Sequence, residues 1–165
     1  MNPHRVFIAI NVPEDTKERL LAYKEKWPEL PARWSTKENL HITLAFLGNT
    51  SNQELAEVCE LLQRIKETHT SFPICITNIT YGLDAEHPRM IWAHVEKSPQ
   101  LLNLQKNIEK ILGMPTEASA KAGQGSDKSF SPHLTLARLK AFELQRIELE
   151  EIPIIEEEIS LSFTA

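Results

Sequence analysis

The strongest constraint on this chain is a short segment, HITLAFL, that begins at His41 and returns as HLTLARL at His133. The two copies agree at five of seven positions, including the histidine and the threonine two residues after it. The apolar residues around them are typical of a strand, in which successive side chains point to opposite faces. His41 and Thr43 therefore share one face, as do His133 and Thr135. Each copy is predicted to present an imidazole and a hydroxyl on a strand whose other face is apolar.

The repetition separates a catalytic interpretation from a structural one. A single histidine in an apolar strand is more often a core residue with a satisfied hydrogen bond. A core needs no second His-x-Thr in the same hydrophobic frame, whereas an acid/base mechanism with two centres does. We therefore interpret His41 and His133 as a pair suited to metal-free chemistry at a phosphate group. Their wide separation in the chain indicates two similar lobes, each contributing one strand.

Length and composition predict a globular protein. The 165 residues favour one domain, residues 1–165, and are 41% apolar and 25% charged. The formal charge of −5 argues against a protein that coats nucleic acid non-specifically, because such binding depends on many Lys and Arg contacts to phosphates. A local site for a small or terminal phosphate is compatible with this charge. No apolar run approaches the roughly 20 residues of a membrane helix, and the apolar stretch at the N-terminus is too short for a signal peptide.

The two cysteines, Cys59 and Cys75, lack a neighbouring Cys or His at metal-ligand spacing. Without a secretory signal they are predicted to be reduced, buried thiols of a cytoplasmic protein. We expect no metal site and no cofactor.

The order of expected elements indicates an α+β fold, with helices packed on antiparallel sheets. A loop through Arg33 and Trp34 is expected before the first motif strand. The segment 114–129 is interpreted as a surface loop, with a lid as the alternative. The other expected elements are a buried strand (5–11), a helix (13–27), a helix opened by a capping box at Ser51, two strands (72–80 and 89–96), a helix between Ser98 and Gly113, and a closing strand within 148–164.

Apolar stripes define the buried faces expected for the second and third helices. The stripe after Ser51 includes Cys59, and the stripe after Ser98 includes Ile111. Both side chains are therefore predicted to be buried.

Four segments of the chain resemble the two-histidine (2H) phosphoesterase superfamily, which is defined by two His-x-Thr/Ser motifs. These segments are RVFIAI, ENLHITLAFLG, MIWAHV and FSPHLTLARL. The closer resemblance is to its bacterial and archaeal branch, the RNA 2′,3′-cyclic phosphodiesterases once described as 2′-5′ RNA ligases. It covers nearly the whole chain. It implies a bilobal, pseudo-two-fold α+β fold, with antiparallel sheets lining a central cleft and helices outside, and an enzyme that needs no cofactor.

The resemblance also implies roles for the motif residues. His41 would be the proton donor, His133 the proton acceptor, and Thr43 and Thr135 would hold the phosphate oxygens. The implied substrates are RNA ends or nucleotides with a 2′,3′-cyclic phosphate, opened to a 2′-phosphomonoester. Another 2H cyclic phosphodiesterase activity, 2′-5′ ligation, and non-catalytic binding of RNA ends or nucleotides are the alternatives.

Two further motif positions, Phe46 and Arg138, leave alternatives open. Family members often carry Arg at the second position, which suggests a phosphate or base contact, and Phe46 could stack on a base. Strict alternation, however, places Arg138 on the face opposite His133, and Phe46 likewise opposite His41. Either the strand bends or ends there, or Arg138 is a solvated charge and Phe46 a core residue. His94 is interpreted as a packing or partly exposed residue beside Trp92, in preference to a catalytic one.

Family members usually continue beyond the segment ISLSFTA with which this sequence ends. The resemblance therefore implies an incomplete sheet in one lobe, an exposed sheet edge, or an edge that a partner chain covers. We expect a monomer, with a dimer through this edge as the alternative.

Overall fold

A computed structural model describes residues 4–82, 88–114, 130–140 and 155–165. The segment interpreted as a loop or lid at 114–129 lies largely outside these residues. The described elements are β1 (His4–Asn11), α1 (Glu14–Ala22), η1 (Tyr23–Lys26), β2 (Ala32–Trp34), η2 (Lys37–Asn39), β3 (His41–Thr50), α2 (Asn52–Thr68), β4 (Pro73–Tyr81), β5 (Met90–Val95), α3 (Pro99–Ile111), β6 (His133–Leu139) and β7 (Glu156–Thr164).

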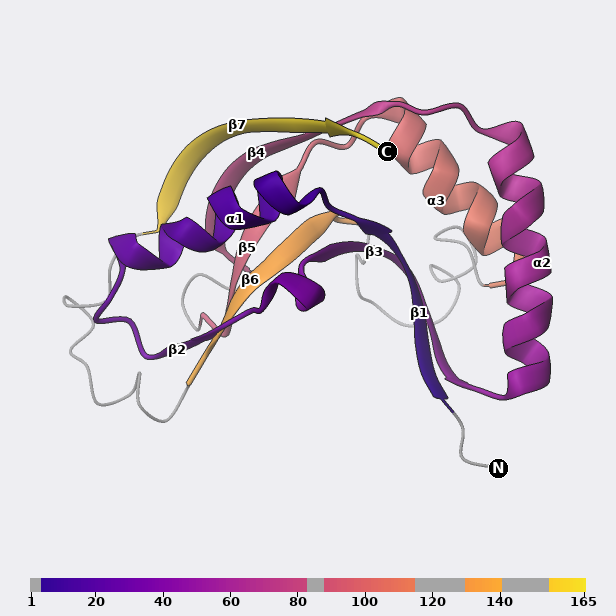
Figure 1. The fold of residues 1–165 in the computed structure, drawn as a ribbon, viewed down its shortest axis with the longest axis horizontal. Coiled ribbons are helices and arrows are strands. Elements are labelled where there is room, and N and C mark those ends of the chain that lie inside the picture. Colours follow the sequence, from indigo (N-terminus) through magenta and orange to yellow (C-terminus); the bar gives the residue numbers. More distant parts are fainter. Residues whose placement is uncertain (1–3, 83–87, 115–129, 141–154) are drawn as a thin grey trace, which may run out of the picture.

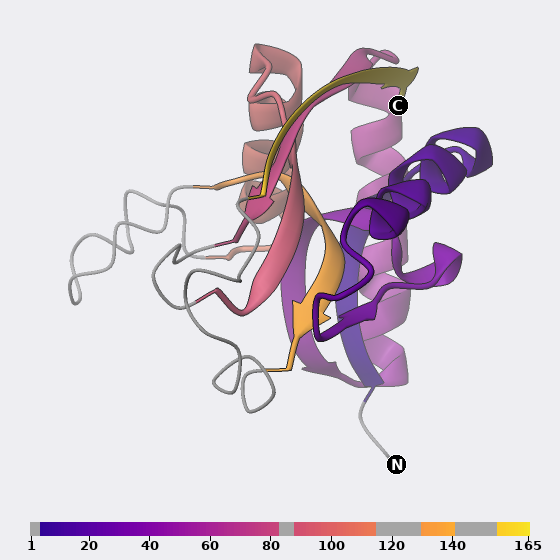
Figure 2. The ribbon, with the colours of Figure 1, turned by 90° about the vertical axis from the view of Figure 1, so that its left-hand side faces the viewer.

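The described strands form two antiparallel sheets. One pairs β1 with β3, and the other has the order β2-β6-β5-β4-β7. Figure 1 shows the strands as a curved framework with α2 and α3 side by side at one end. Figure 2 shows β4 and β7 curving together along one edge. Mixed helices and antiparallel sheets confirm the predicted α+β class.

Local sequence signals fix the ends of α2 and α3. The Ser51 hydroxyl accepts the Glu54 backbone N–H while the Glu54 carboxylate accepts the Ser51 N–H, so the predicted capping box is confirmed. Ser98 caps α3, with Pro99 in its first turn. Gly113 follows α3 with a φ of 64°, a conformation in which a glycine costs little.

The predicted burial is wrong at four places. Cys59 is exposed, because α2 buries only Ile65 completely, and Cys75 is half-buried. Ile111 is exposed at the last turn of α3, where the helix has passed the core. The strand β1 is partly exposed along its length, because it forms an edge of a two-stranded sheet and pairs only with β3.

Among the residues that the structure describes, one hydrophobic core joins both sheets and the three α-helices. Its fully buried side chains come from elements distant in sequence: Leu20, Leu40, Ile42, Ile74, Ile76, Ile79, Ile91, Leu101, Ile108, Leu134, Leu136 and Ile155. The expected helix at 13–27 divides into α1 and the short turn η1.

The loop predicted through Arg33 and Trp34 is instead the strand β2, which pairs with β6 at the edge of the larger sheet. Three residues are too few to show a period of two, so local pattern could not identify this strand. Trp34 packs against the core, and Arg33 is exposed.

Candidate active site

The two motif copies form β3 and β6, strands of different sheets that contact each other. Their first six residues have the same sequence of exposure: half-buried histidine, buried aliphatic, half-buried threonine, two buried apolar residues, then an exposed residue. The half-buried positions are those of His41, Thr43, His133 and Thr135, which the sequence singled out. The repeat in sequence is therefore also a repeat in local structure.

Both motif strands carry a bulge at the same position. Ala9 pairs with Thr43 and Ile8 with Ala45, so that Leu44 has no partner in the β1–β3 ladder. In the same way Leu136 is passed over in the β5–β6 ladder. A bulge places two residues opposite one and shifts the alternation of faces.

The bulges correct the strict alternation expected for Phe46 and Arg138. Leu44 and Ala45 both point into the core, and so do their counterparts in β6. Phe46 therefore returns to the face of His41, and Arg138 to the face of His133. Local sequence could not reveal this, because the bulge is defined by pairing with β1 and β5.

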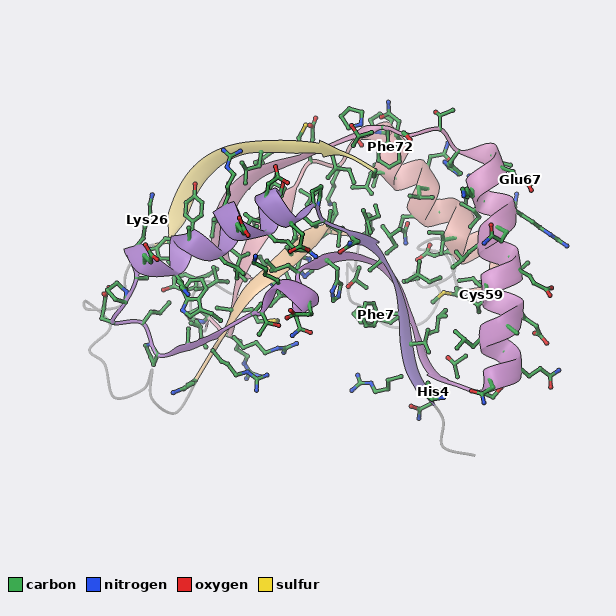
Figure 3. All side chains as sticks on the ribbon, viewed as in Figure 1. His4, Phe7, Lys26, Cys59, Glu67 and Phe72 are labelled. Carbon is green, nitrogen blue, oxygen red and sulfur yellow. The ribbon has the colours of Figure 1, made fainter. Side chains whose placement is uncertain are left out.

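The His41 imidazole lies against an aromatic side chain of β1. Its ring stacks on Phe7 with the centroids 4.6 Å apart and the planes inclined by 21°. The Phe7 ring also contacts Phe46, at 6.2 Å between centroids. Figure 3 shows Phe7 projecting from β1 on the side away from α2. Phe46 is 71% exposed and Phe7 43%, so the face that carries His41 also presents an aromatic surface to solvent.

A buried lysine, Lys17, lies near His41. Its side chain, from α1, is nearly inaccessible and its ammonium contacts the Glu14 carboxylate at 2.9 Å. Burial, followed by the positive charge of Lys17, lowers the pKa of His41 below its usual value of about 6.5. No local pattern in the sequence indicates this role for Lys17, because α1 approaches β3 only through the tertiary fold.

The His133 imidazole lies flat on the indole of Trp92, with centroids 3.7 Å apart and planes inclined by 18°. Its Nδ1 lies 2.7 Å from the Ser131 carbonyl oxygen. Since a carbonyl only accepts, Nδ1 carries the proton and Nε2 is left with a lone pair. Burial lowers the pKa of His133, opposed by the Ser131 hydrogen bond. His133 is thus held as a neutral imidazole whose Nε2 can accept a proton.

His94 is the direct cross-strand partner of His133 in the β5–β6 ladder, so the two side chains share a face. Its Nε2 lies 2.8 Å from the Thr80 hydroxyl, which itself donates to the Tyr81 carbonyl. The His94 Nε2–H is therefore the donor. Burial, then the charge of a protonated His133, lowers the pKa of His94. These contacts fit the packing role expected for His94, and its position beside His133 follows from the β5–β6 register, which no local pattern predicts.

Among the described ranges, no group of three or more His, Cys, Asp or Glu side chains could hold a metal ion. None of the described helices is long and apolar enough to cross a bilayer.

Comparison with known proteins identifies relatives over most of the chain. Residues 10–92 match the family model described as LigT like Phosphoesterase. An RNA 2′,3′-cyclic phosphodiesterase of Thermotoga maritima is 31% identical over 140 residues, covering 84% of this chain and 71% of the relative. The protein of that name from Methanocaldococcus jannaschii is 30% identical over 139 residues, covering 82% and 72%.

Solved structures share the fold. A crystal structure of a Thermus thermophilus protein superposes with a TM-score of 0.78 at 25% identity, over 98% of this chain and 84% of that one. Escherichia coli LigT complexed with 3′-AMP gives a TM-score of 0.69 at 25% identity, over 98% and 83%.

Proposed function

The chain belongs to the LigT-like phosphoesterase family, and from this membership we propose that it hydrolyses RNA 2′,3′-cyclic phosphate ends to 2′-phosphomonoesters. The observation that carries the proposal is the pair of bulged strands, each presenting a histidine and a threonine on one face. Relatives named RNA 2′,3′-cyclic phosphodiesterase support the substrate class.

His133 acts as the general base in the proposed reaction. A water molecule attacks phosphorus while its proton passes to Nε2 of His133, the nitrogen left unprotonated by the bond from Nδ1 to the Ser131 carbonyl. The lowered pKa of His133 favours the neutral form near pH 7. Stacking on Trp92 restricts rotation of the ring.

His41 acts as the general acid. It gives a proton to the leaving 3′ oxygen as the bond from that oxygen to phosphorus breaks, leaving the phosphate on the 2′ oxygen. Burial and Lys17 disfavour the protonated form of free His41, and an anionic phosphate beside the ring opposes both effects by favouring its positive charge. Each proton transfer of this kind contributes typically ~10²–10⁴ in rate.

Four further side chains contact the substrate in this proposal. Thr43 and Thr135 donate to the non-bridging oxygens, on which charge builds during the attack. Phe46 offers its exposed ring to the base, at a stacking gain of about 1–3 kcal/mol. Arg138 lies on the face of His133, where its guanidinium suits a phosphate oxygen.

The direct test is incubation with nucleoside 2′,3′-cyclic phosphates, with phosphorus NMR to identify the product. We expect a 2′-phosphomonoester, a bell-shaped dependence of kcat/KM on pH, and the same rate with and without EDTA. His41→Ala and His133→Ala are each expected to lower kcat by at least about a hundredfold. Full turnover by either variant would overturn the assignment.

The alternatives give different results in the same assay. A non-catalytic binder retains the cyclic phosphate unchanged while binding it. A ligase joins a 2′,3′-cyclic end to a 5′-hydroxyl end, which gel electrophoresis of two short RNAs detects. A 2H enzyme of other specificity leaves RNA ends intact but opens another cyclic phosphate.

A cytoplasmic location and a monomeric state complete the proposal. Free cysteines, one of them exposed, suit a reducing compartment. The strand β7 lies at the edge of the larger sheet, beside β4, which is where a second chain would pair in a dimer. Light scattering over a range of concentrations distinguishes the two states.

A further inference from the structure

Two arginines lie directly opposite each other at the end of the larger sheet. Arg33 of β2 pairs with Arg138 of β6 in the antiparallel ladder, and both side chains are exposed. Cross-strand partners point to the same face, with Cβ atoms about 4.5–5.5 Å apart. Since the bulge at Leu136 returns Arg138 to the face of His133, Arg33 shares this face as well.

This arrangement is unfavourable unless an anion occupies it. Like charges directly opposite in a sheet are destabilising. Within the described ranges, no carboxylate forms an ion pair with Arg33 or Arg138. Two adjacent guanidinium groups provide the forked donors that phosphate oxygens accept in bidentate pairs.

The position of the arginine pair relative to the motif indicates which phosphate it would bind. Thr135 and Arg138 pair with Trp92 and Met90, which are two residues apart on β5, so the bulge leaves roughly 7 Å between them along the strand at about 3.4 Å per residue. The long arginine side chains can shorten this separation. The distance between a phosphate held by Thr135 and a second one held by the arginines is therefore similar to the distance between neighbouring phosphates of one RNA strand.

The two motif copies differ at their sixth residue, and this difference favours one orientation of the bound substrate. The position after the two core residues is Phe46 in β3 and Arg138 in β6. The first copy offers an aromatic ring, and the second, together with Arg33, offers positive charge. A nucleotide with its base toward Phe46 and its sugar–phosphate chain toward Arg138 meets both.

We propose that Arg33 and Arg138 form a subsite for the phosphate on the 5′ side of the terminal nucleotide, so that the enzyme favours RNA ends over free nucleoside cyclic phosphates. This inference rests on the proposed function. It assigns to Arg33 the recognition of a group that takes no part in the reaction.

A minimal pair of substrates tests the subsite. One is adenosine 2′,3′-cyclic phosphate with a 5′-hydroxyl, and the other is the same molecule with a 5′-phosphate. We expect the 5′-phosphate to raise kcat/KM about tenfold, as hydrogen bonds between charged groups suggest. Arg33→Gln and Arg138→Gln should each remove most of this advantage. An equal kcat/KM for the two substrates, or an advantage that survives both substitutions, overturns the subsite.

Salt dependence gives a second, independent measurement. With a dinucleotide that ends in a cyclic phosphate, the slope of log(1/KM) against log[salt] should become shallower by about 0.7 for each phosphate contact removed. Arg64→Ala, on the exposed side of α2, is the matched control and should leave both the slope and the 5′-phosphate advantage unchanged. An unaltered slope in Arg33→Gln contradicts the proposal.

The assay separates this inference from the proposed function. Failure to open either substrate rejects the hydrolase itself. Hydrolysis of both substrates without preference rejects only the arginine subsite. Circular dichroism and turnover of the 5′-hydroxyl substrate establish that Arg33→Gln is folded.

Discussion

Trp92 separates His133 from Gly82. The imidazole covers one face of the indole at 3.7 Å. A Cβ built on Gly82 would lie 2.5 Å from two indole atoms and 2.9 Å from a third, above the middle of the ring system. This Cβ cannot lie on the indole face that His133 covers, because atoms of His133 would then be nearer to it than the indole atoms are. Gly82 therefore contacts the opposite face, and the indole is held between a backbone and the proposed general base.

Replacing the indole tests whether it positions His133. Trp92 is 7% exposed, and its Nε1 has no hydrogen-bond partner in the described part of the chain, so Trp92→Phe retains stacking without losing a bond. Aromatic pairs contribute about 0.5–1.5 kcal/mol, so Trp92→Leu should lower kcat/KM roughly three- to tenfold relative to Trp92→Phe. The pKa of His133 should also rise in Trp92→Leu, because the ring becomes more hydrated. Identical rates and pH profiles in the two variants would leave Trp92 with a structural role only.

Gly82→Ala should damage the same contact from the other side. The added methyl must displace the indole, which typically costs about 1–3 kcal/mol of unfolding free energy. The cost should largely disappear in the background of Trp92→Leu, where the space is vacant. Urea denaturation of the four proteins in this cycle measures the coupling, and additive effects would show that Gly82 is constrained by something other than the indole.

The catalytic candidates could be predicted from sequence because polar residues repeated in apolar strands have few structural explanations. The capping box of α2 could be predicted because its hydrogen bonds are local, between residues 51 and 54. The faces of Phe46 and Arg138 could not, because the bulges arise from pairing with distant strands. Stacking of Trp92 on His133 and the approach of Lys17 to His41 likewise depend on tertiary packing.

Substitution of Lys17 should change the acidity of His41. The buried ammonium disfavours a second positive charge nearby, so Lys17→Met is expected to raise the pKa of His41. The pH range in which His41 can donate a proton then extends upward. Proton NMR titration of the imidazole measures the shift directly, with His133 in the same spectrum as the reference. An unchanged pKa of His41 in Lys17→Met would mean that burial alone lowers it.

Protein stability should depend on pH through three histidines. Burial lowers the pKa of His41, His94 and His133 in the folded protein below the value of about 6.5 expected in the unfolded chain. Below that pH the unfolded chain binds more protons than the folded one, so the unfolding free energy falls as pH decreases from 6.5 through the folded-state values. Above pH 6.5 the contribution of these groups is fully present.

His94→Gln removes one of these contributions while both motif histidines stay in place. Glutamine can still donate to the Thr80 hydroxyl, and it does not titrate. The decrease in unfolding free energy between pH 7.5 and 5.5, measured by urea denaturation, should therefore be smaller in His94→Gln than in the native protein. His4→Ala, at the exposed start of β1, is the control and should not change that decrease. If His94→Gln loses as much stability as the native protein over this range, burial of His94 does not contribute to the acid sensitivity.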